Sequence, residues 1–422
     1  MFDKKDTYFP IKQAPACQLK WTWSSLWLTE GTTASCHRCK KVPLDLDNFD
    51  NFHNHPHKIN ERKIMLSGKW PTIENGGSGH CQYCKVVEDA GGFSDRMHML
   101  TIPNQAPKEL LNNPTAVVVT PKILELYINS TCNLACTYCN TRDSSKIKAE
   151  AKKFGPIVLP DGSHAERTNY KPTHPKQRQY WEKTMEYIKK NGNELRRLHI
   201  LGGEPFFISE TQELLDTLKT LKNPHLEFCI ISNMMVKHDR FQHYIEQIKQ
   251  LCMERKIGRF DLTTSIDAWG PEAEYARMGL KCDQFLKNFD YAVKEKWIVI
   301  HTQSVMTSLT MRAMPELLKI LNDRRKNRRI GQEFSYVIGR VWMHPKQYGG
   351  EFWRNDFKNI LEHMPDDLDR NKIIKKYMIG LQKSIDLLPK NEKMITFLKS
   401  YLDTIDKRRN TNWRKIYPYL DI

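Results

Sequence analysis

The chain has 422 residues, 40% of them hydrophobic, which is enough for two or three domains with buried cores. The first ten residues are charged without an apolar stretch, and no apolar run approaches the roughly 20 residues that span a bilayer. We therefore expect a cytoplasmic protein with no membrane partner. The net charge of +17 favours an anionic partner such as RNA, although a solvated basic surface would give the same balance.

Five of the eleven cysteines lie in an N-terminal segment that we place at residues 1–105. They form two CxxC pairs, preceded by one further cysteine: Cys36 with Cys39, Cys81 with Cys84, and Cys17. Because nothing indicates secretion, we interpret this clustering as metal ligation rather than as disulfide bonding. Two CxxC pairs have the spacing of a structural zinc site.

Strand and helix patterns alternate over the next segment, residues 106–341. Its strand candidates are short apolar runs of the kind that buried parallel strands show. This order predicts a parallel α/β array, either a partial barrel or an open doubly wound sheet, and in both folds ligands bind at the carboxyl ends of the strands. The predicted strands are 122–128, 196–201, 227–231, 260–266, 297–305 and 333–341.

Two other segments complete the chain. Residues 141–180 are polar and basic, and we expect this long insertion to cover a site. Residues 342–422 have helical patterns with two apolar stripes, which we expect to be packing faces. The stripes are Ile373, Tyr377, Leu381 and Ile385, followed by Met394, Phe397, Leu398, Tyr401 and Leu402.

The stretch STCNLACTYCN, residues 130–140, directly follows the first predicted strand. It places Cys132, Cys136 and Cys139 within eight positions and offers no fourth cysteine nearby. A structural zinc site needs four ligands. Three thiolates can hold a 4Fe–4S cluster with one iron left free, and a small molecule can chelate that iron through an amine and a carboxylate.

A second motif, LGGEP, stands at the end of the second predicted strand. Gly202 and Gly203 allow the backbone to approach a ligand closely, and Glu204 can accept hydrogen bonds from an ammonium group. Alone this motif is a weak signal. One strand–helix unit after CxxxCxxC it becomes a strong one.

With both motifs in this order, the sequence resembles the radical S-adenosylmethionine (SAM) superfamily. The resemblance implies a (β/α)6 partial barrel with a catalytic 4Fe–4S cluster. It also implies reductive cleavage of SAM to a 5′-deoxyadenosyl radical, which abstracts a hydrogen atom from a substrate. Cys132, Cys136 and Cys139 are the implied cluster ligands. The implied SAM site comprises Tyr138, Gly202, Gly203, Glu204, Ser232, Asn233, Ser265, Asp267 and Arg277, with Arg277 suited to the SAM carboxylate.

The N-terminal cysteine segment looks like the auxiliary-cluster module of SPASM/Twitch radical SAM proteins, here placed before the barrel. The stretches CQLKWTWSSLWLTEGTTASC and CQYCKVVEDAGGFSDR carry this resemblance, and the C-terminal FLKSYLDTIDKRRNTNWRKIYPYL is similar to the ending of that group. The resemblance implies a second 4Fe–4S cluster on Cys17, Cys36, Cys81 and Cys84. Cys39 departs from the pattern and leaves open whether it or Cys36 is a ligand.

SPASM/Twitch enzymes often modify peptides or proteins, so the resemblance implies a peptide or protein substrate and an electron donor such as a flavodoxin or ferredoxin. Radical modification of RNA or a nucleotide is the alternative that the charge favours. A third hypothesis is a non-catalytic, zinc-dependent nucleic-acid-binding protein. It explains the charge and the CxxC pairs, but it leaves CxxxCxxC followed by GGEP without an explanation.

Overall fold

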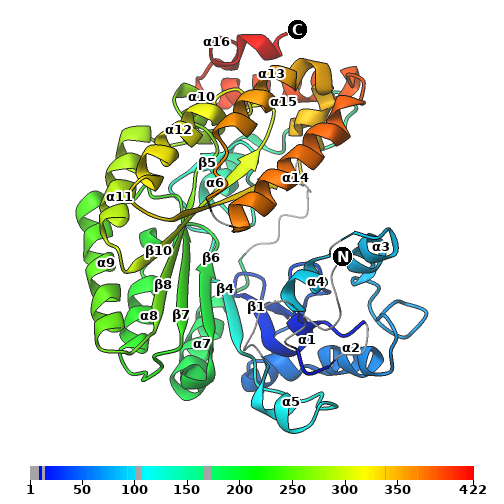
Figure 1. The fold of residues 1–422 in the computed structure, drawn as a ribbon, viewed down its shortest axis with the longest axis vertical. Coiled ribbons are helices and arrows are strands. Elements are labelled where there is room, and N and C mark those ends of the chain that lie inside the picture. The colour runs from blue at the N-terminus through cyan, green and yellow to red at the C-terminus, as the bar shows by residue number, and fades with distance from the viewer. Residues whose placement is uncertain are drawn as a thin grey trace.

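The computed structural model describes residues 9–11, 15–92, 94–100, 106–165, 173–337, 339–367 and 369–422. A nine-stranded sheet forms the centre of the described structure, in the order β11-β10-β8-β7-β6-β4-β1-β2-β3. A separate two-stranded sheet pairs β5 (Ala135–Cys136) with β9 (Arg277–Met278). Figure 1 shows helices covering the side of the large sheet that carries α8, α9 and α11, and further helices beyond its upper end.

Six parallel strands make up most of the large sheet, and neighbours in the sheet follow the order of the chain. A doubly wound sheet reverses its strand order at a switch point, and this sheet does not. The predicted parallel α/β array is therefore confirmed, in the form consistent with a partial barrel. The strands are β4 (Ile123–Tyr127), β6 (Arg197–Leu201), β7 (Glu227–Ser232), β8 (Arg259–Ser265), β10 (Ile298–Met306) and β11 (Ile330–Tyr336).

The predicted bounds of the sixth strand, 333–341, were wrong, since β11 spans Ile330–Tyr336. The strand begins earlier because Gly331 belongs to it: a Cβ at this position would lie 2.3 Å from Nδ1 of His301 on β10, so only glycine fits beside that ring. Glycine weakens a strand pattern in the sequence. The chain leaves the sheet after Tyr336 and forms a short 3-10 helix at Val341–Met343.

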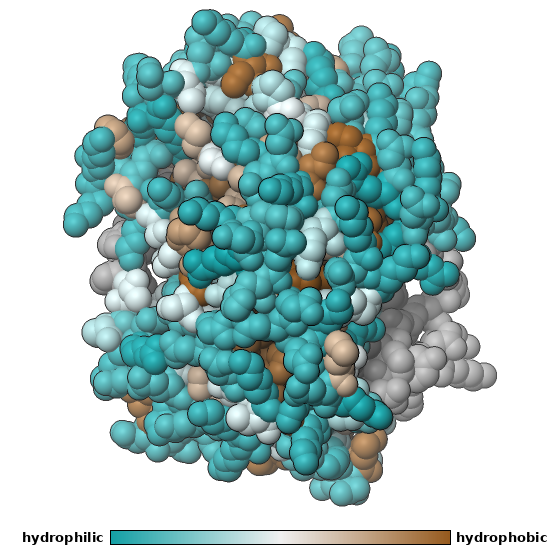
Figure 2. All heavy atoms as spheres, turned by 90° about the vertical axis from the view of Figure 1, so that its left-hand side faces the viewer, coloured by the Kyte–Doolittle hydropathy of each residue, from teal (hydrophilic) through white to brown (hydrophobic). Residues whose placement is uncertain are grey.

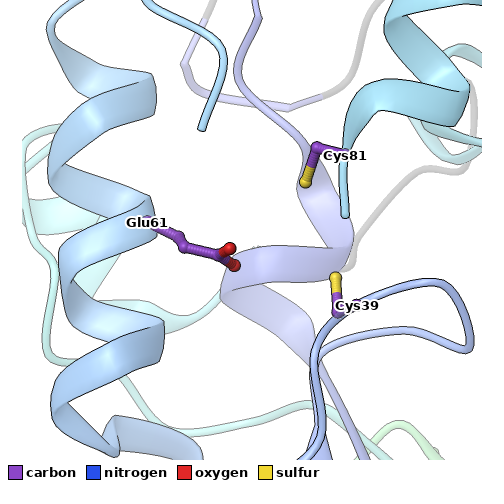
Figure 3. Close-up of side chains that lie close together, drawn as sticks. All are labelled: Cys39, Glu61 and Cys81. Carbon is purple, nitrogen blue, oxygen red and sulfur yellow. The ribbon is translucent and has the colours of Figure 1, made fainter. Parts of the chain in front are cut away.

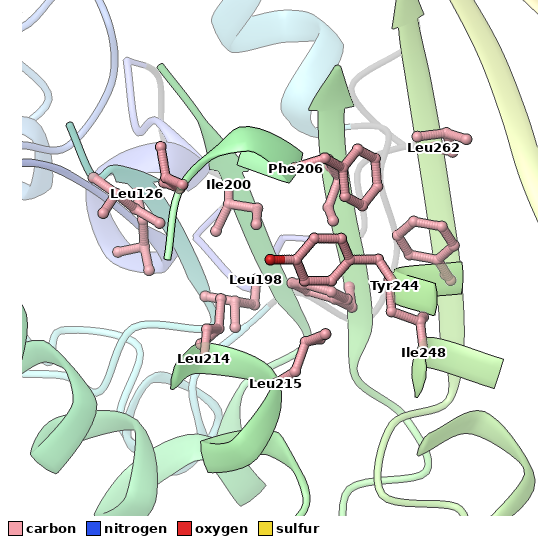
Figure 4. Close-up of a cluster of buried hydrophobic side chains, with 14 of the residues drawn as sticks. Leu126, Leu198, Ile200, Phe206, Leu214, Leu215, Tyr244, Ile248 and Leu262 are labelled. Carbon is pink, nitrogen blue, oxygen red and sulfur yellow. The ribbon is translucent and has the colours of Figure 1, made fainter. Parts of the chain in front are cut away.

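The helices between these strands bury their apolar faces against the sheet. Figure 4 shows Tyr244 and Ile248 of α9 and Leu214 of α8 packed against strand residues such as Leu198 and Leu262. Burial of each such side chain stabilises the fold by about 1.5–3 kcal/mol. The outer side of these helices is largely hydrophilic (Figure 2). Their bounds are α7 (Gln177–Asn191), α8 (Glu210–Leu218), α9 (His238–Met253), α10 (Pro271–Ala276), α11 (Cys282–Lys294) and α12 (Met314–Arg325).

The N-terminal segment continues the same sheet. Strand β1 (Trp23–Trp27) pairs in parallel with β4, and β2 (Thr32–Ala34) and β3 (Val42–Pro43) add antiparallel strands beyond it. The N-terminal cysteines are thus joined to the first barrel strand by backbone hydrogen bonds. The helices of this segment are α1 (Gln18–Thr22), α2 (Pro56–Leu66), α3 (Gln82–Asp89), α4 (Asp95–Leu100) and α5 (Lys108–Asn112).

In the described part of the insertion after the cysteine motif, α6 spans Ser145–Phe154 and α7 begins at Gln177. Ile157 and Leu159 of the insertion share a core with the C-terminal helices. In that core the second predicted stripe is confirmed, since Phe397, Leu398, Tyr401 and Leu402 are buried and Met394 is partly buried. The first stripe was partly wrong, because Ile373 and Tyr377 are 64% and 53% exposed. The C-terminal helices are α13 (Gly350–His363), α14 (Asp369–Asp386), α15 (Glu392–Arg409) and α16 (Trp413–Ile416).

Among the described residues, no helix has the length and apolar character needed to cross a membrane.

Candidate functional site: two cysteine centres

The loop that follows β4 carries the first cysteine centre. Cys132, Cys136 and Cys139 are free thiols, each partly buried. Cys136 lies in β5, where it is the register partner of Arg277 in β9. The amide of Cys139 donates a hydrogen bond of 3.0 Å to the carbonyl of Cys136, which closes a turn between these two residues. This turn and the β5–β9 pairing shape the part of the loop that carries Cys136 and Cys139.

The three thiols are electrostatically coupled. Burial raises the pKa of Cys132 to about 12 and also raises the pKa values of Cys136 and Cys139. The Cys136 thiolate raises the pKa of each of the other two further. A positively charged metal centre would reverse this effect, because thiols lose their protons when they bind a metal. The donor set therefore fits a group that brings positive charge among three sulfurs.

A single ion fits these three sulfurs poorly. Zinc holds sulfur ligands at about 2.3 Å, so neighbouring ligand atoms lie about 4 Å apart. Within the part of the chain that the structure describes, the one set of three or more candidate ligand atoms all within 4.8 Å of one another lies elsewhere. A cluster of several irons, which spaces its ligands more widely, is the better match for Cys132, Cys136 and Cys139.

The Gly-Gly-Glu-Pro loop rests on the cysteine loop. Gly203 has a φ of +60°, and a Cβ there would lie 2.3 Å from the carbonyl oxygen of Thr131. The next amide, of Glu204, donates a 2.9 Å hydrogen bond to that same oxygen. Glycine at 203 is therefore required by this close approach of two backbone segments. The contact joins the end of β6 to the residue before Cys132.

Glu204 is fully buried and has protein partners. Its carboxylate accepts hydrogen bonds from the Ser232 hydroxyl at 2.8 Å and from the amides of Asn233 and Phe206 at 2.6 and 3.1 Å. Burial raises the pKa of Glu204 to about 7. The sequence suggested that Glu204 accepts hydrogen bonds from a ligand ammonium; in the structure it connects the ends of β6 and β7.

Asn233 reaches the cysteine loop. Its side-chain amide donates a 2.8 Å hydrogen bond to Oδ1 of Asn133 and lies 3.8 Å from Sγ of Cys132. The ends of β4, β6 and β7 thus converge on the first cysteine of the motif. Asn133 was not singled out from the sequence, because an asparagine between two cysteines has no signal of its own.

The remaining predicted SAM-site residues lie around the end of β8. Asp267 and Arg277 are both buried, and the guanidinium donates two hydrogen bonds of 2.8 and 2.9 Å to the carboxylate. The Tyr138 hydroxyl donates to the same carboxylate at 2.6 Å. Asp267 and Arg277, which the resemblance assigned to SAM, are thus bonded to each other. Ser265 is the last residue of β8 and lies opposite Gln303 of β10.

The second cysteine centre lies in the N-terminal segment. Figure 3 shows Cys39, Cys81 and Glu61, whose ligand atoms all lie within 4.8 Å of one another. The sulfur of Cys36 lies 3.1 Å from that of Cys39. The Lys20 ammonium, 3.0 Å from the Cys39 sulfur, also pairs with the Glu61 carboxylate. Cys39 is therefore at the middle of this group.

The charges of this centre are arranged around one thiolate. Hydrogen bonds from the Cys36 and Cys81 thiols hold the pKa of Cys39 well below its usual value, while the same bonds raise the pKa values of Cys36 and Cys81. Burial disfavours the charge of Lys20, yet the thiols of Cys39 and Cys81 and the Glu61 carboxylate raise its pKa well above the usual value. A buried thiolate beside an ammonium is the charge pattern of a metal-binding or reactive cysteine.

Cys17 and Cys84 differ in their relation to this centre. Cys17 is buried and electrostatically coupled to Cys39 and Lys20. The pKa of Cys84 is raised mainly by burial, and the neighbouring groups that act on it are Arg96, Asp95, Ser94 and Glu88 rather than the other cysteines. The structure thus brings Cys36, Cys39 and Cys81 together near Cys17.

Comparison with known protein families finds a match for the middle of this chain. Residues 126–321 match the family model described as the radical SAM superfamily. This range starts in β4, ends in α12 and includes the CxxxCxxC motif and the Gly-Gly-Glu-Pro loop. This part of the chain is thus similar to the radical SAM superfamily domain. Such domains belong to enzymes that use a 4Fe–4S cluster and SAM and that cleave SAM to a radical.

The other comparisons are weaker. No curated protein matches the chain. A solved structure, the crystal structure of Streptococcus suis SuiB, is 16% identical over 81% of this chain and 67% of its own, with a TM-score of 0.36. Similarity at this level carries no argument about function.

Two residues beside the radical SAM domain were missed from the sequence. Lys20 in α1 and Glu61 in α2 reach the N-terminal cysteines from separate helices. No local motif marks either residue, because each meets the cysteines only after the chain has folded. Their burial, at 2% and 1% exposure, is the signal that identifies them.

Proposed function

We propose that this chain is a radical SAM enzyme in which Cys132, Cys136 and Cys139 hold the catalytic 4Fe–4S cluster. The observation that carries this proposal is the contact of Gly203 with Thr131, which places the Gly-Gly-Glu-Pro loop directly beside the cysteine loop. When bound, the cluster supplies one electron to the sulfonium of SAM, whose C–S bond then breaks to give methionine and a 5′-deoxyadenosyl radical.

The chain's own residues hold this site in place. Glu204 and Asn233 tie the ends of β6 and β7 to the first part of the cysteine loop. Tyr138, Asp267 and Arg277 form a buried network next to Cys136. Radical chemistry needs such a closed and rigid site, since the radical would otherwise react with solvent or with the protein.

A peptide or protein is the substrate class that we favour. The resemblance to SPASM/Twitch enzymes supports it. The sequence has two basic runs, residues 323–329 and 406–415, and the pairing of several of their arginines with protein groups weakens the case for RNA. In the first run, Arg324 pairs with Asp290, and Arg328 donates to backbone carbonyls that include those of Val293 and Glu295. In the second, Arg414 pairs with Asp403. Part of the positive charge of these runs is thus balanced by groups of the protein itself, which leaves less of it for nucleic-acid phosphates.

For the N-terminal centre we propose a second 4Fe–4S cluster on Cys17, Cys36, Cys39 and Cys81. The resemblance to SPASM/Twitch proteins supports a cluster, and the grouping of these four cysteines supports a shared metal site. The close spacing of the Cys39, Cys81 and Glu61 ligand atoms suits a single ion. Protein ligands on all of its irons would leave no position for substrate, so electron relay and substrate placement are the roles that suit it. An electron donor such as a flavodoxin or ferredoxin would reduce the enzyme. A structural zinc ion on the same cysteines is the competing occupant.

Metal analysis and SAM turnover test these proposals together. After anaerobic reconstitution we expect about eight irons per chain, falling to about four when Cys132, Cys136 and Cys139 are all replaced by alanine. Reduced wild-type protein should convert SAM to 5′-deoxyadenosine, and the triple variant should not. The matched control replaces three cysteines away from both centres, Cys229, Cys252 and Cys282. It should preserve both the iron content and the formation of 5′-deoxyadenosine.

Each other outcome has a definite meaning. About four irons with one zinc would support the radical chemistry and make the N-terminal centre structural. If the wild-type protein bound no iron, or bound iron but formed no 5′-deoxyadenosine, the proposed radical SAM activity would be refuted. Peptide fractions of a cell extract should stimulate 5′-deoxyadenosine formation, whereas stimulation by the RNA fraction alone would replace the peptide proposal with the RNA one.

A further inference from the structure

The cysteine loop is held by three side chains that lie outside the matched domain. Each donates a hydrogen bond to a backbone carbonyl of the loop, and the three acceptors are alternate residues. The bonds are Arg409 Nη1 to Ala135 at 2.9 Å, the Tyr401 hydroxyl to Thr137 at 2.6 Å, and Arg340 Nη2 to Cys139 at 2.5 Å. These three bonds fasten the loop to the C-terminal region.

Two of the donors form one packed unit. The Arg340 guanidinium lies over the ring of Tyr401, 4.8 Å from its centroid, and the same ring packs against Trp342 at 5.9 Å. Tyr401 and Arg340 are 2% and 4% exposed. A buried ring in contact on two sides has little freedom to turn, so the hydroxyl of Tyr401 is fixed toward the loop.

The third donor connects the loop to the helix that follows it. Arg409, at the end of α15, forms an ion pair with Glu150 of α6 at 2.9 Å, and both side chains are largely buried. The guanidinium thus joins α15, α6 and the carbonyl of Ala135. Its fixed planar geometry suits this use, since one face of the fork binds the carboxylate and another nitrogen binds the carbonyl.

The loop is also fastened within the matched domain. β5 pairs with β9, and the amide and hydroxyl of Thr137 both donate to the carbonyl of Ala276, at 2.8 and 3.1 Å. Thr137 is thus bonded on both sides, to Ala276 and to Tyr401. The residues between these anchor points are Cys136 and Tyr138, and Cys139 follows directly.

We propose that Tyr401, Arg409 and Arg340 are positioning residues that hold the CxxxCxxC loop in its iron-binding conformation. The inference rests on the proposed function for the identity of the bound group. The hydrogen bonds that hold the loop are a property of the protein alone. It follows that the C-terminal region from residue 340 onward takes part in assembling the metal site of a domain that ends near residue 321.

The first test replaces Tyr401 with phenylalanine, which removes the hydroxyl and keeps the packed ring. The matched control is Tyr348→Phe, since Tyr348 is also buried in this core and donates to a backbone carbonyl, that of Leu420, far from the cysteines. In the metal-free protein, alkylation of Cys136 and Cys139 measured by mass spectrometry should accelerate roughly fivefold in Tyr401→Phe, the effect of losing one buried hydrogen bond on local opening. Tyr348→Phe should match the wild type.

The second test applies the same comparison to arginines. Arg409→Gln removes the bond to Ala135, whereas Arg408→Gln removes bonds to the carbonyls of Gly155 and Pro156 and serves as the control. After reconstitution, we expect Tyr401→Phe and Arg409→Gln to bind less iron at the first centre and to show an altered electron paramagnetic resonance spectrum of the reduced protein. Both controls should give the wild-type spectrum.

The outcomes distinguish the positioning role of these residues from the proposed radical SAM function. Equal alkylation in wild type, Tyr401→Phe and Arg409→Gln would overturn the positioning role, even if the protein is a working radical SAM enzyme. Equal acceleration in the controls would also overturn it, because it would reflect a loosened C-terminal core. A wild-type protein that protects its cysteines through Tyr401 but binds no iron would refute the proposed function and leave the positioning role standing.

Discussion

The guanidinium of Arg277 and the carboxylate of Asp267 form a buried ion pair with two hydrogen bonds, at 2.8 and 2.9 Å. Arg277 is also the register partner of Cys136 in the β5–β9 ladder. The pair therefore links the end of β8 to the second cysteine of the motif. Arg277 and Asp267 are bonded to each other, and Asp267 also accepts a hydrogen bond from Tyr138. We therefore expect both residues to affect SAM binding through the shape of the site.

Loss of Arg277 should destabilise the protein strongly. Arg277→Met leaves the Asp267 carboxylate buried without its cation, which lowers the free energy of unfolding by about 3–5 kcal/mol. The control is Arg312→Met: Arg312 pairs with Asp356 but is 41% exposed, so the expected loss is below about 1 kcal/mol. Urea unfolding measures both. If Arg277→Met weakened SAM binding with unchanged stability, Arg277 would be a SAM ligand, as the resemblance implied.

Gly203→Ala tests the contact between the two motif loops. The added Cβ meets the Thr131 carbonyl at 2.3 Å in a backbone conformation with positive φ, so the loops must separate, and we expect a loss of about 2–4 kcal/mol. Gly162→Ala is the control, because Gly162 has a φ of +80° and nothing within 4 Å. It should lose only about 1 kcal/mol. Thermal unfolding and SAM binding are the measurements, and equal losses in the two variants would contradict the contact.

The sequence predicted the strands and the residues at their ends well. Apolar runs such as 227–231 mark buried parallel strands, because this property is local. The sequence also indicated a close backbone approach at Gly203, which it assigned to a ligand; the structure shows this approach with the Thr131 carbonyl. Five of the six strands were placed within one residue at each end, as for 122–128 against Ile123–Tyr127. The parallel arrangement followed from the alternation of strands with helices.

Pairings between distant side chains were not predictable in this way. Nothing near Asp267 indicates that Arg277 satisfies it, and CxxC spacing does not specify which sulfur of Cys36 and Cys39 faces the other cysteines. The pairing of β1 with β4 joins residues about 100 positions apart. Each of these depends on tertiary contacts between segments whose local patterns are compatible with several partners.

Glu204 should make stability depend on pH between about 4.5 and 7. Its pKa is raised to about 7 in the folded protein because burial disfavours the carboxylate, so folding binds a proton. The stabilisation is complete below the unfolded pKa near 4.5 and is lost as the pH rises to about 7, a change on the order of 3 kcal/mol. Glu204→Gln does not titrate.

The measurement is the difference in unfolding free energy between wild type and Glu204→Gln from pH 5 to pH 8. The wild type should lose stability relative to the variant up to about pH 7, with no further change above it. Parallel curves would mean that the hydrogen bonds from Ser232 and Asn233 keep Glu204 ionised throughout this range.

The N-terminal centre gives the sharpest contrast between resemblance and structure. The resemblance names Cys84 as a ligand, whereas the structure places Cys39 beside Cys36 and Cys81. We expect Cys39→Ala to lose the metal of this centre, about four irons or one zinc per chain, and Cys84→Ala to retain it.

Metal analysis of the two single variants settles the ligand set whichever metal is bound. Retention in Cys39→Ala with loss in Cys84→Ala would show that the loop carrying Cys84 turns toward the centre when metal binds. Loss in both variants would mean that five cysteines are required. Lys20 adds a further expectation, because its ammonium donates to the Cys39 sulfur and stabilises a thiolate there. Lys20→Met should therefore weaken metal binding only if Cys39 is a ligand.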